Sequence, residues 1–489
     1  MKAKVLFISF LLFAVVSNTC AQNTSQLSRT VSDLANDAAL KHANLSVCVY
    51  NMDKKTCVYS YNSQLSMAPA SLAKLFTTAC GFDKLGSDFR FRTTLAYSGS
   101  IDNSGTLRGD LYIIGGGDPL LGSYRYRQTV PDSIFAMWHR AVSAAGIRAV
   151  DGRVCYDASI FDESPIHDSW QWGDIGNYYG SGVSGLNFHE NMFFIYFTPG
   201  PKVGAPTTIS RIAPAGITLR TVNEVTTGPA RSGDQVVVYG DPSSTMRVCQ
   251  GTMPIDARDF SVRASLPKPG QACADLFTVY LRNHKVSVSG AATKAFERPA
   301  NLVTLIDYTS PTYYVIAQYT NMTSNNTYAE AIFKYLGYRI SGIGSHTHGA
   351  KVVGDFLKGL NLSQEGVRLE GVRLEDGCGL SPLNRITTDY MCRFLMVLKD
   401  KPFYDDFVKS MALAGSNGTV RNMLTGLPSN VSVRMKSGSL DGVRSFAGYV
   451  TTAKNEHYSF AVICSDYTCS GSQMRTKLEK VIMKIATME

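Results

Sequence analysis

The sequence predicts an α/β (α+β) protein in which one sheet, with helices on both faces, is interrupted by a large, mostly β insertion. Strand-like and helix-like segments occur at both ends of the chain, and short strands separated by turns fill its middle. The length of 489 residues exceeds what one compact core usually holds. With 44% hydrophobic and 18% charged residues, a disordered or fibrous chain is excluded.

Residues 1–21 have the features of an export signal. Lys2 and Lys4 precede a short apolar run, Val5–Val16, which is too short for a permanent membrane helix. The small residues Thr19–Ala21 then predict a cleavage site, and a lipid anchor on Cys20 is the alternative. We therefore expect an exported protein of the periplasm or cell envelope, with no transmembrane segment after leader removal.

Charge and cysteine content limit the expected partners. The net charge of +9 is small for this length, and no arginine-rich stripe supports nucleic-acid binding. The 11 cysteines include no Cys-x-x-Cys pair, so a zinc cluster is not expected. Without Cys20 an even number remains, which permits disulfides in an exported chain but does not reveal their pairing. We expect neither a metal nor a cofactor, and the oligomeric state stays open.

Residues 22–90 form the first part of the predicted sheet domain. Apolar residues recur at helical spacing over 27–38. Residues 45–50 and 56–61 then predict a strand hairpin. A helix is expected to begin at Pro69, because proline suits the first turn of a helix.

Residues 91–300 are predicted to form inserted β-rich subdomains, and residues 301–489 the second part of the sheet domain. The insertion contains short strands, such as 91–97, between clusters of turn residues. In the last part, a helix over 327–336 is expected to end at Gly337. Strand-like runs and an amphipathic helix follow at 431–435, 443–451, 457–464 and 478–485. The simplest architecture is one sheet of about five strands, two from the N-terminal part and three from the C-terminal part.

The leading catalytic candidate is the motif Ser71-Leu72-Ala73-Lys74 in the helix expected at Pro69. A serine hydroxyl is a weak nucleophile that needs a base within reach, and positions i and i+3 share one helix face. A lysine base must be neutral, which requires an environment worth roughly 4 kcal/mol. An ordinary N-cap serine is the alternative for Ser71 alone. Ser265 and Lys268 have the same spacing, but the adjacent prolines forbid a helix there.

Two more polar motifs lie downstream. Ser324–Asn326 precedes a predicted helix, where a tight loop could point a hydroxyl and a carboxamide into a cleft. Lys436–Gly438 follows the strand-like run 431–435, and a glycine there lets another backbone approach closely. Each motif alone has an alternative as a turn, a helix cap or an exposed strand end.

Together the three motifs resemble the S-x-x-K, S-D-N and K-T-G set of penicillin-binding proteins and serine β-lactamases, in the same order. Asn325 replaces the aspartate and Ser437 the threonine. The wide separation of Ser71 from Ser324 is similar to that in the D-Ala-D-Ala carboxypeptidase/endopeptidases, the class C penicillin-binding proteins. The resemblance runs from about residue 30 to the end of the chain. Further segments that match this family are Gly116–Pro119, Asp376–Ser381, Leu413–Gly415, Gly418–Thr419 and Lys436–Leu440. The departures from its usual serine, arginine and aspartate are Cys378, Pro382 and Asn417.

The resemblance implies a penicillin-binding transpeptidase/β-lactamase-like fold and a serine-type DD-peptidase acting on peptidoglycan stem peptides. It implies that Ser71 is the nucleophile, that Lys74 is its base and that Ser324 relays a proton to the leaving amine. The substrate-binding residues that it implies are Asn326, Lys436, Ser437, Gly438 and Ser439. The backbone N–H groups of Ser71 and Ser439 resemble an oxyanion hole. β-Lactam antibiotics are the implied covalent inhibitors.

Two other functions share some of these features. A serine β-lactamase would use Ser71 and Lys74 but needs a further base for rapid deacylation, and no glutamate is an obvious candidate. A non-catalytic muropeptide-binding module is the second alternative, and it leaves the intact motif residues unexplained.

Two weaker candidates lie elsewhere. His346 and His348 could bind a metal, but the surrounding glycines predict a solvated loop. Trp170, Trp172 and Asp174 could border a substrate cleft or form a structural aromatic cluster.

Overall fold

The computed structural model describes residues 25–362 and 371–488, so the predicted leader lies outside the described residues. Close contacts divide the chain into two compact units. The first contains the described residues up to Asp83, Ala317–Ser324 and those from Val353 onward. The second contains Lys84–Ile316 and Asn325–Val352. The domain boundaries predicted from the sequence stay a prediction: 22–90 and 301–489 as two parts of one sheet domain, with 91–300 inserted between them.

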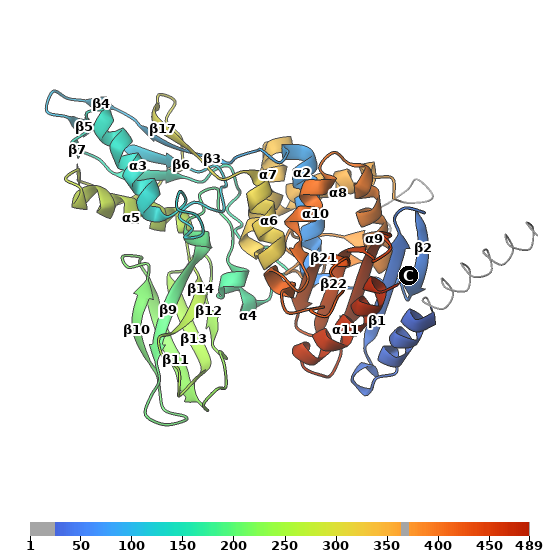
Figure 1. Cartoon of the computed structure of the whole chain (residues 1–489). Coiled ribbons are helices and arrows are strands. Elements are labelled where there is room, and N and C mark those ends of the chain that lie inside the picture. The colour runs from blue at the N-terminus through green and yellow to red at the C-terminus, as the bar shows by residue number, and fades with distance from the viewer. Residues whose placement is uncertain (1–24, 363–370, 489) are drawn as a thin grey trace, which may run out of the picture. The chain divides into compact units, whose positions relative to one another are not determined.

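The first unit is built on one six-stranded antiparallel sheet of order β2-β1-β23-β22-β21-β20. Figure 1 shows its blue N-terminal strands beside the dark-red C-terminal ones. The strands are β1 (Asn44–Asn51), β2 (Thr56–Tyr61), β20 (Ala412–Leu413), β21 (Ser432–Leu440), β22 (Val443–Thr451) and β23 (His457–Ser465). The predicted sheet of two N-terminal and three C-terminal strands is confirmed, and β20 adds a short sixth strand.

Helices cover both faces of this sheet. Successive side chains of a strand point to opposite faces, and apolar side chains on each face pack against a helix. Val47 and Val49 of β1 join a core with the helix over 25–35 and with α11. Between them, Cys48 accepts a hydrogen bond at its carbonyl from Cys392 of α9, at 3.2 Å. The helices of this unit are 25–35, α2 (Ala73–Leu85), α9 (Thr388–Val397), α10 (Tyr404–Ser410) and α11 (Gly471–Ala486). A two-stranded sheet joins β18 (Val372–Arg373) to β19 (Arg385–Ile386).

The second unit contains four sheets, so the expected β-rich insertion is present. A five-stranded sheet has the order β16 (Thr293–Lys294), β8 (Val154–Asp157), β6 (Leu111–Ile114), β3 (Arg92–Tyr97) and β17 (Val303–Thr309). A four-stranded sheet has the order β15 (Ser287–Val288), β7 (Ala149–Val150), β5 (Thr106–Arg108) and β4 (Ser100–Ile101). One three-stranded sheet has the order β10 (Thr208–Ala213), β9 (Met192–Thr198) and β14 (Phe260–Ser265). The other has the order β11 (Arg220–Gly228), β13 (Met246–Pro254) and β12 (Val237–Tyr239).

Helices α3 (Pro131–Ala144) and α5 (Pro269–Asn283) contribute Trp138 and Phe277 to the core of the larger sheets. The short α4 (Trp172–Ile175) also belongs to this unit. None of the helices in the described part of the chain is both long and apolar enough to cross a membrane.

The helices after residue 310 differ from the sequence prediction in extent. Helix α7 runs over Asn326–Ser341, beyond the expected end at Gly337, and is capped by Gly342 with φ +74°. Gly337 lies inside the helix, where it makes room for His348. A Cβ added to Gly337 would lie 2.9 Å from the Cβ of His348. Helices α6 (Tyr313–Thr323) and α8 (His346–Gly359) each pass from one unit to the other.

Candidate active site

Ser71 lies at a sharp backbone turn directly before α2. It is the middle residue of a single 3-10 turn, Ala70–Leu72, in which Ala70 has φ +49°. This left-handed conformation is rare for a residue with a side chain, so the surrounding structure must hold it. Ser445 of β22 contributes by donating a hydrogen bond from Oγ to the carbonyl of Pro69, at 2.8 Å. The turn leaves the Ser71 side chain half-buried rather than enclosed in the core.

Lys74 is fully buried one helical turn after Ser71. Its Nζ lies 2.9 Å from Ser71 Oγ and 2.5 Å from the carbonyl oxygen of Cys378. Both contacts are at hydrogen-bond distance. The amine of Lys74 is therefore within reach of the proton that a nucleophilic Ser71 must lose.

A second serine–lysine pair joins the end of α6 to β21. Lys436 Nζ donates a hydrogen bond to Ser324 Oγ at 2.8 Å. Ser324 has φ +61°, so the chain turns sharply where α6 ends. The end of α6 is fixed by Asn321, whose Nδ2 donates to Thr78 Oγ1 at 3.1 Å and to Ser410 Oγ at 2.9 Å. Helices α2 and α10 thus position the loop that carries Ser324.

The two lysines influence each other. Burial lowers the pKa of Lys436 well below its ordinary value, and the charge of Lys74 lowers this pKa further. Both side chains are fully buried, so two positive charges there would be costly. The site therefore favours a neutral amine on at least one lysine, which is the form that a general base requires.

Lys436–Gly438 lie inside β21, not after a strand ending at Met435 as the sequence pattern predicted. All nine residues of β21 pair with β22, and this pairing continues the strand through polar residues and a glycine. On the opposite edge, β20 pairs only with Arg434 and Met435. Among the described residues, no further strand covers that edge from Lys436 onward. An extended peptide can add to such an edge through main-chain hydrogen bonds.

The open edge carries hydroxyl groups and one required glycine. Ser437 Oγ lies 2.7 Å from Thr419 Oγ1, in a hydrogen bond that fixes its orientation. A Cβ on Gly438 would lie 2.2 Å from Ser445 Oγ and 2.7 Å from the carbonyl of Pro69. Gly438 therefore lets β21 pack closely against the turn before the nucleophile. Ser439, the next residue, is exposed.

Asn326 belongs to the second unit, as the first residue of α7. Its Nδ2 donates to the carbonyl of Tyr179 at 2.7 Å. Asn325, which replaces the aspartate of the usual motif, caps this helix by accepting a hydrogen bond from the N–H of Tyr328 at 3.0 Å. Asparagine and aspartate cap helices about equally well, which gives a physical reason for the replacement.

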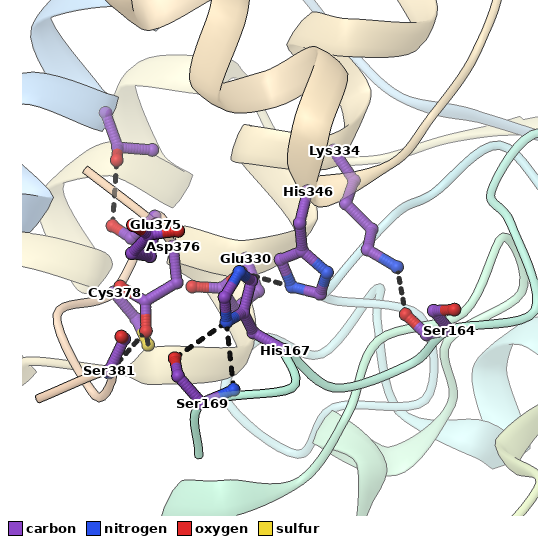
Figure 2. A network of polar contacts seen from close by, with 12 residues as sticks. Ser164, His167, Ser169, Glu330, Lys334, His346, Glu375, Asp376, Cys378 and Ser381 are labelled. Carbon is purple, nitrogen blue, oxygen red and sulfur yellow. Dashed lines mark hydrogen bonds and ion pairs between the residues drawn. The ribbon is translucent and has the colours of Figure 1, made fainter. Parts of the chain in front are cut away.

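The weaker candidates also lie in the second unit. His346 begins α8 instead of lying in a solvated loop, and it is buried with Nε2 at 3.1 Å from Glu330 Oε2 (Figure 2). The sequence prediction of a loop was wrong because buried contacts of α8 outweigh the glycines around it. Trp170 is buried against the His346 ring, whereas Trp172 is 57% exposed. Burial raises the pKa of Asp174.

Sequence reasoning missed two parts of the site. The carbonyl of Cys378 is a backbone group, so no residue type marks it in the sequence. In the sequence Thr419 stands out only as part of a segment that matches the family, and its bond to Ser437 depends on the tertiary structure.

The chain matches a family model and several known proteins over most of its length. Residues 27–487 match the D-Ala-D-Ala carboxypeptidase 3 (S13) family. A D-alanyl-D-alanine carboxypeptidase of Actinomadura sp. (strain R39) is 28% identical, over 90% of this chain and 81% of that protein. The D-alanyl-D-alanine carboxypeptidase DacB of Haemophilus influenzae is 22% identical, over 91% of this chain and 90% of that protein.

A solved structure supports the same fold. The crystal structure of penicillin binding protein 4 (dacB) from Haemophilus influenzae has a TM-score of 0.78 at 23% identity, covering 93% of this chain and 98% of that chain. A second crystal structure, of the same protein complexed with a β-lactam, has a TM-score of 0.74 at 21% identity and the same coverage. The predicted fold class is thereby confirmed. Because the family model spans nearly the whole sequence, the chain belongs to the D-Ala-D-Ala carboxypeptidase 3 (S13) family, and is a serine-type DD-peptidase.

Proposed function

We propose that this protein hydrolyses D-Ala-D-Ala bonds of peptidoglycan stem peptides through an acyl-enzyme on Ser71. The observation that carries the assignment is the contact of 2.9 Å between Ser71 Oγ and the buried amine of Lys74. Ser71 Oγ forms a bond to the carbonyl carbon of the penultimate residue while Lys74 accepts the hydroxyl proton. The carbon–nitrogen bond then breaks, and water later cleaves the Ser71 ester to regenerate the hydroxyl.

Ser324 and Lys436 supply the proton that the leaving amine needs. The leaving amine takes the hydroxyl proton of Ser324, and the proton that Lys74 accepted from Ser71 replaces it through Lys436, whose Nζ lies 2.8 Å from Ser324 Oγ. Burial and the charge of Lys74 both lower the pKa of Lys436, so Lys436 passes a proton on to Ser324 rather than keeping it. Ser324 thus acts as the acid partner of the base Lys74.

The substrate lies along β21. Ser437, Gly438 and Ser439 provide the open strand edge for its backbone. Lys436, Ser437 and Ser439 hold the terminal carboxylate, and Asn326 binds a substrate amide. The N–H groups of Ser71 and Ser439 stabilise the oxyanion that forms during attack.

β-Lactams acylate Ser71, because their ring amide mimics the D-Ala-D-Ala amide. The related penicillin binding protein 4 of Haemophilus influenzae has been crystallised with a β-lactam, which supports this assignment. We place the protein outside the cytoplasm, in the periplasm or cell envelope, where its substrate is found.

Mass spectrometry of peptides after incubation tests this proposal. A synthetic stem peptide ending in D-Ala-D-Ala should lose one alanine, which defines a carboxypeptidase. A crosslinked muropeptide dimer should be cut to monomers if the protein is also an endopeptidase. Ser71→Ala should abolish both reactions, whereas Ser472→Ala, the same change on an exposed position of α11, should retain them. Unchanged peptides with the wild-type protein would overturn the proposal.

A further inference from the structure

The loop Asp376–Ser381 contacts both halves of the Ser71–Lys74 pair through its backbone. The carbonyl of Cys378 lies 2.5 Å from Lys74 Nζ. Gly379 packs against the turn before the nucleophile so closely that an added Cβ would lie 1.9 Å from the carbonyl of Ala70. Gly379 also has φ +84°, which favours glycine. The position of this loop therefore determines where the amine and the hydroxyl lie.

A single buried carboxylate organises the loop. Asp376 is fully buried, and its Oδ1 accepts hydrogen bonds from the N–H of Gly379 and from Asn384 Nδ2, both at 2.8 Å. Its Oδ2 accepts from the N–H of Ser381 at 2.6 Å and lies 3.7 Å from Cys378 Sγ. Figure 2 shows Asp376 among Cys378 and Ser381. Oδ1 thus holds the N–H of the same peptide group as the Cys378 carbonyl, and Oδ2 holds the N–H of Ser381 two residues later.

The orientation of the Lys74 amine depends on this carbonyl. A neutral amine has two N–H donors and one lone pair. When one N–H is donated to the Cys378 carbonyl, the lone pair is free to accept the proton of Ser71 Oγ, 2.9 Å away. A displacement of about 1 Å can cost about 100-fold in rate when a reacting group must be aligned.

We propose that Asp376 is a positioning residue for acylation, which acts by holding the Cys378 carbonyl against the amine of Lys74. In this role Asp376 acts through the backbone of the loop and not in the bond-making step. The inference rests on the proposed function of Ser71 and Lys74. It predicts that loss of Asp376 slows the acylation step without weakening the initial binding of substrate.

The test separates the two steps with a fluorescent penicillin in stopped-flow experiments on the full-length protein. Asp376→Asn places an amide N–H₂ where the carboxylate now accepts backbone N–H groups. Its first-order acylation rate should fall about 10- to 100-fold, while the dissociation constant of the non-covalent complex changes less than about 3-fold. Asn384→Ala removes one of the bonds to Asp376 and should cause a smaller fall, and it decides the question if Asp376→Asn does not fold.

The matched control is Asp389→Asn. Asp389 is also a buried carboxylate of the first unit, but it binds Tyr50 of β1 and Arg393 of α9. Its substitution should lower the melting temperature without changing the acylation rate. If the Asp376 and Asn384 variants were acylated at the wild-type rate, as is expected of the Asp389 variant, this inference alone would be overturned. Absence of acylation in the wild-type protein would instead overturn the proposed function and this inference with it.

Discussion

Lys436 Nζ and Ser324 Oγ lie 2.8 Å apart, although 112 positions separate the two residues in the sequence. The lysine comes from the central part of a strand and the serine from a turn after α6. Their contact brings an acid–base pair to the same buried region as Lys74, whose charge lowers the pKa of Lys436.

Lys436→Met should stabilise the protein at neutral pH while abolishing its activity. Burial lowers the pKa of Lys436 in the folded state, so the unfolded chain binds one more proton between that lowered pKa and about 10.5. The stability of the wild-type protein therefore rises with pH across this window, and its penalty is full below the lowered pKa. We expect a gain of about 1 to 3 kcal/mol near pH 7 for the variant.

Thermal unfolding of both proteins across this pH range measures the effect. The difference in stability between Lys436→Met and wild type should shrink as the pH approaches about 10.5. A difference that grows with pH would show that Lys436 is charged and well stabilised in the folded protein.

Lys74→Gln should lower the acylation rate by about 10²- to 10⁴-fold, because the hydroxyl of Ser71 loses its base. Lys84→Gln is the matched control, since Lys84 is an exposed lysine near the end of the same helix. Labelling with a fluorescent penicillin over time compares the two variants. If both reacted at the wild-type rate, Lys74 would not be the base.

Thr419→Val should weaken substrate binding more than catalysis. The change removes the 2.7 Å hydrogen bond that orients Ser437 Oγ on the open edge of β21. Loss of one neutral hydrogen bond costs about 1 kcal/mol, so KM for a D-Ala-D-Ala peptide should rise about 5-fold with little change in kcat. Thr476→Val on the exposed side of α11 should leave KM unchanged, and an equal KM in both variants would contradict the role given to Thr419.

Asn325→Asp should preserve stability, whereas Asn325→Ala should lose about 1 kcal/mol. Aspartate can accept the same hydrogen bond from the N–H of Tyr328, and its charge suits a helix N-terminus. Urea unfolding of the three proteins provides the comparison. A strongly destabilised Asn325→Asp variant would mean that the cap is not the reason for asparagine at this position.

The main sheet could be predicted from the sequence because its strands carry local patterns. The hairpin over 45–50 and 56–61 and the runs at 443–451 and 457–464 are apolar enough to indicate strands without any tertiary information. The helix after Ser71 was also visible, through its apolar face and Pro69. The three motifs predicted Ser71 and Lys74 on a helix, Ser324 on a loop and Lys436 at a strand, but Ser71 lies in the 3-10 turn directly before α2.

Features that depend on tertiary contacts could not be predicted. The extension of β21 through Ser437–Leu440 results from pairing with β22, which overrides the weak strand preference of glycine and serine. The left-handed Ala70 is imposed by its surroundings. The bond from Lys74 to the Cys378 carbonyl spans 304 positions and uses a backbone atom, so no residue pattern encodes it.

Mass spectrometry of the protein after reaction with benzylpenicillin tests the central role of Ser71 most directly. The intact protein should gain the mass of one penicilloyl group, and the digested protein should carry it on the peptide that contains Ser71. Ser71→Ala should gain no mass. An adduct on another residue, or a wild-type protein that remains unmodified, would contradict the acyl-enzyme mechanism.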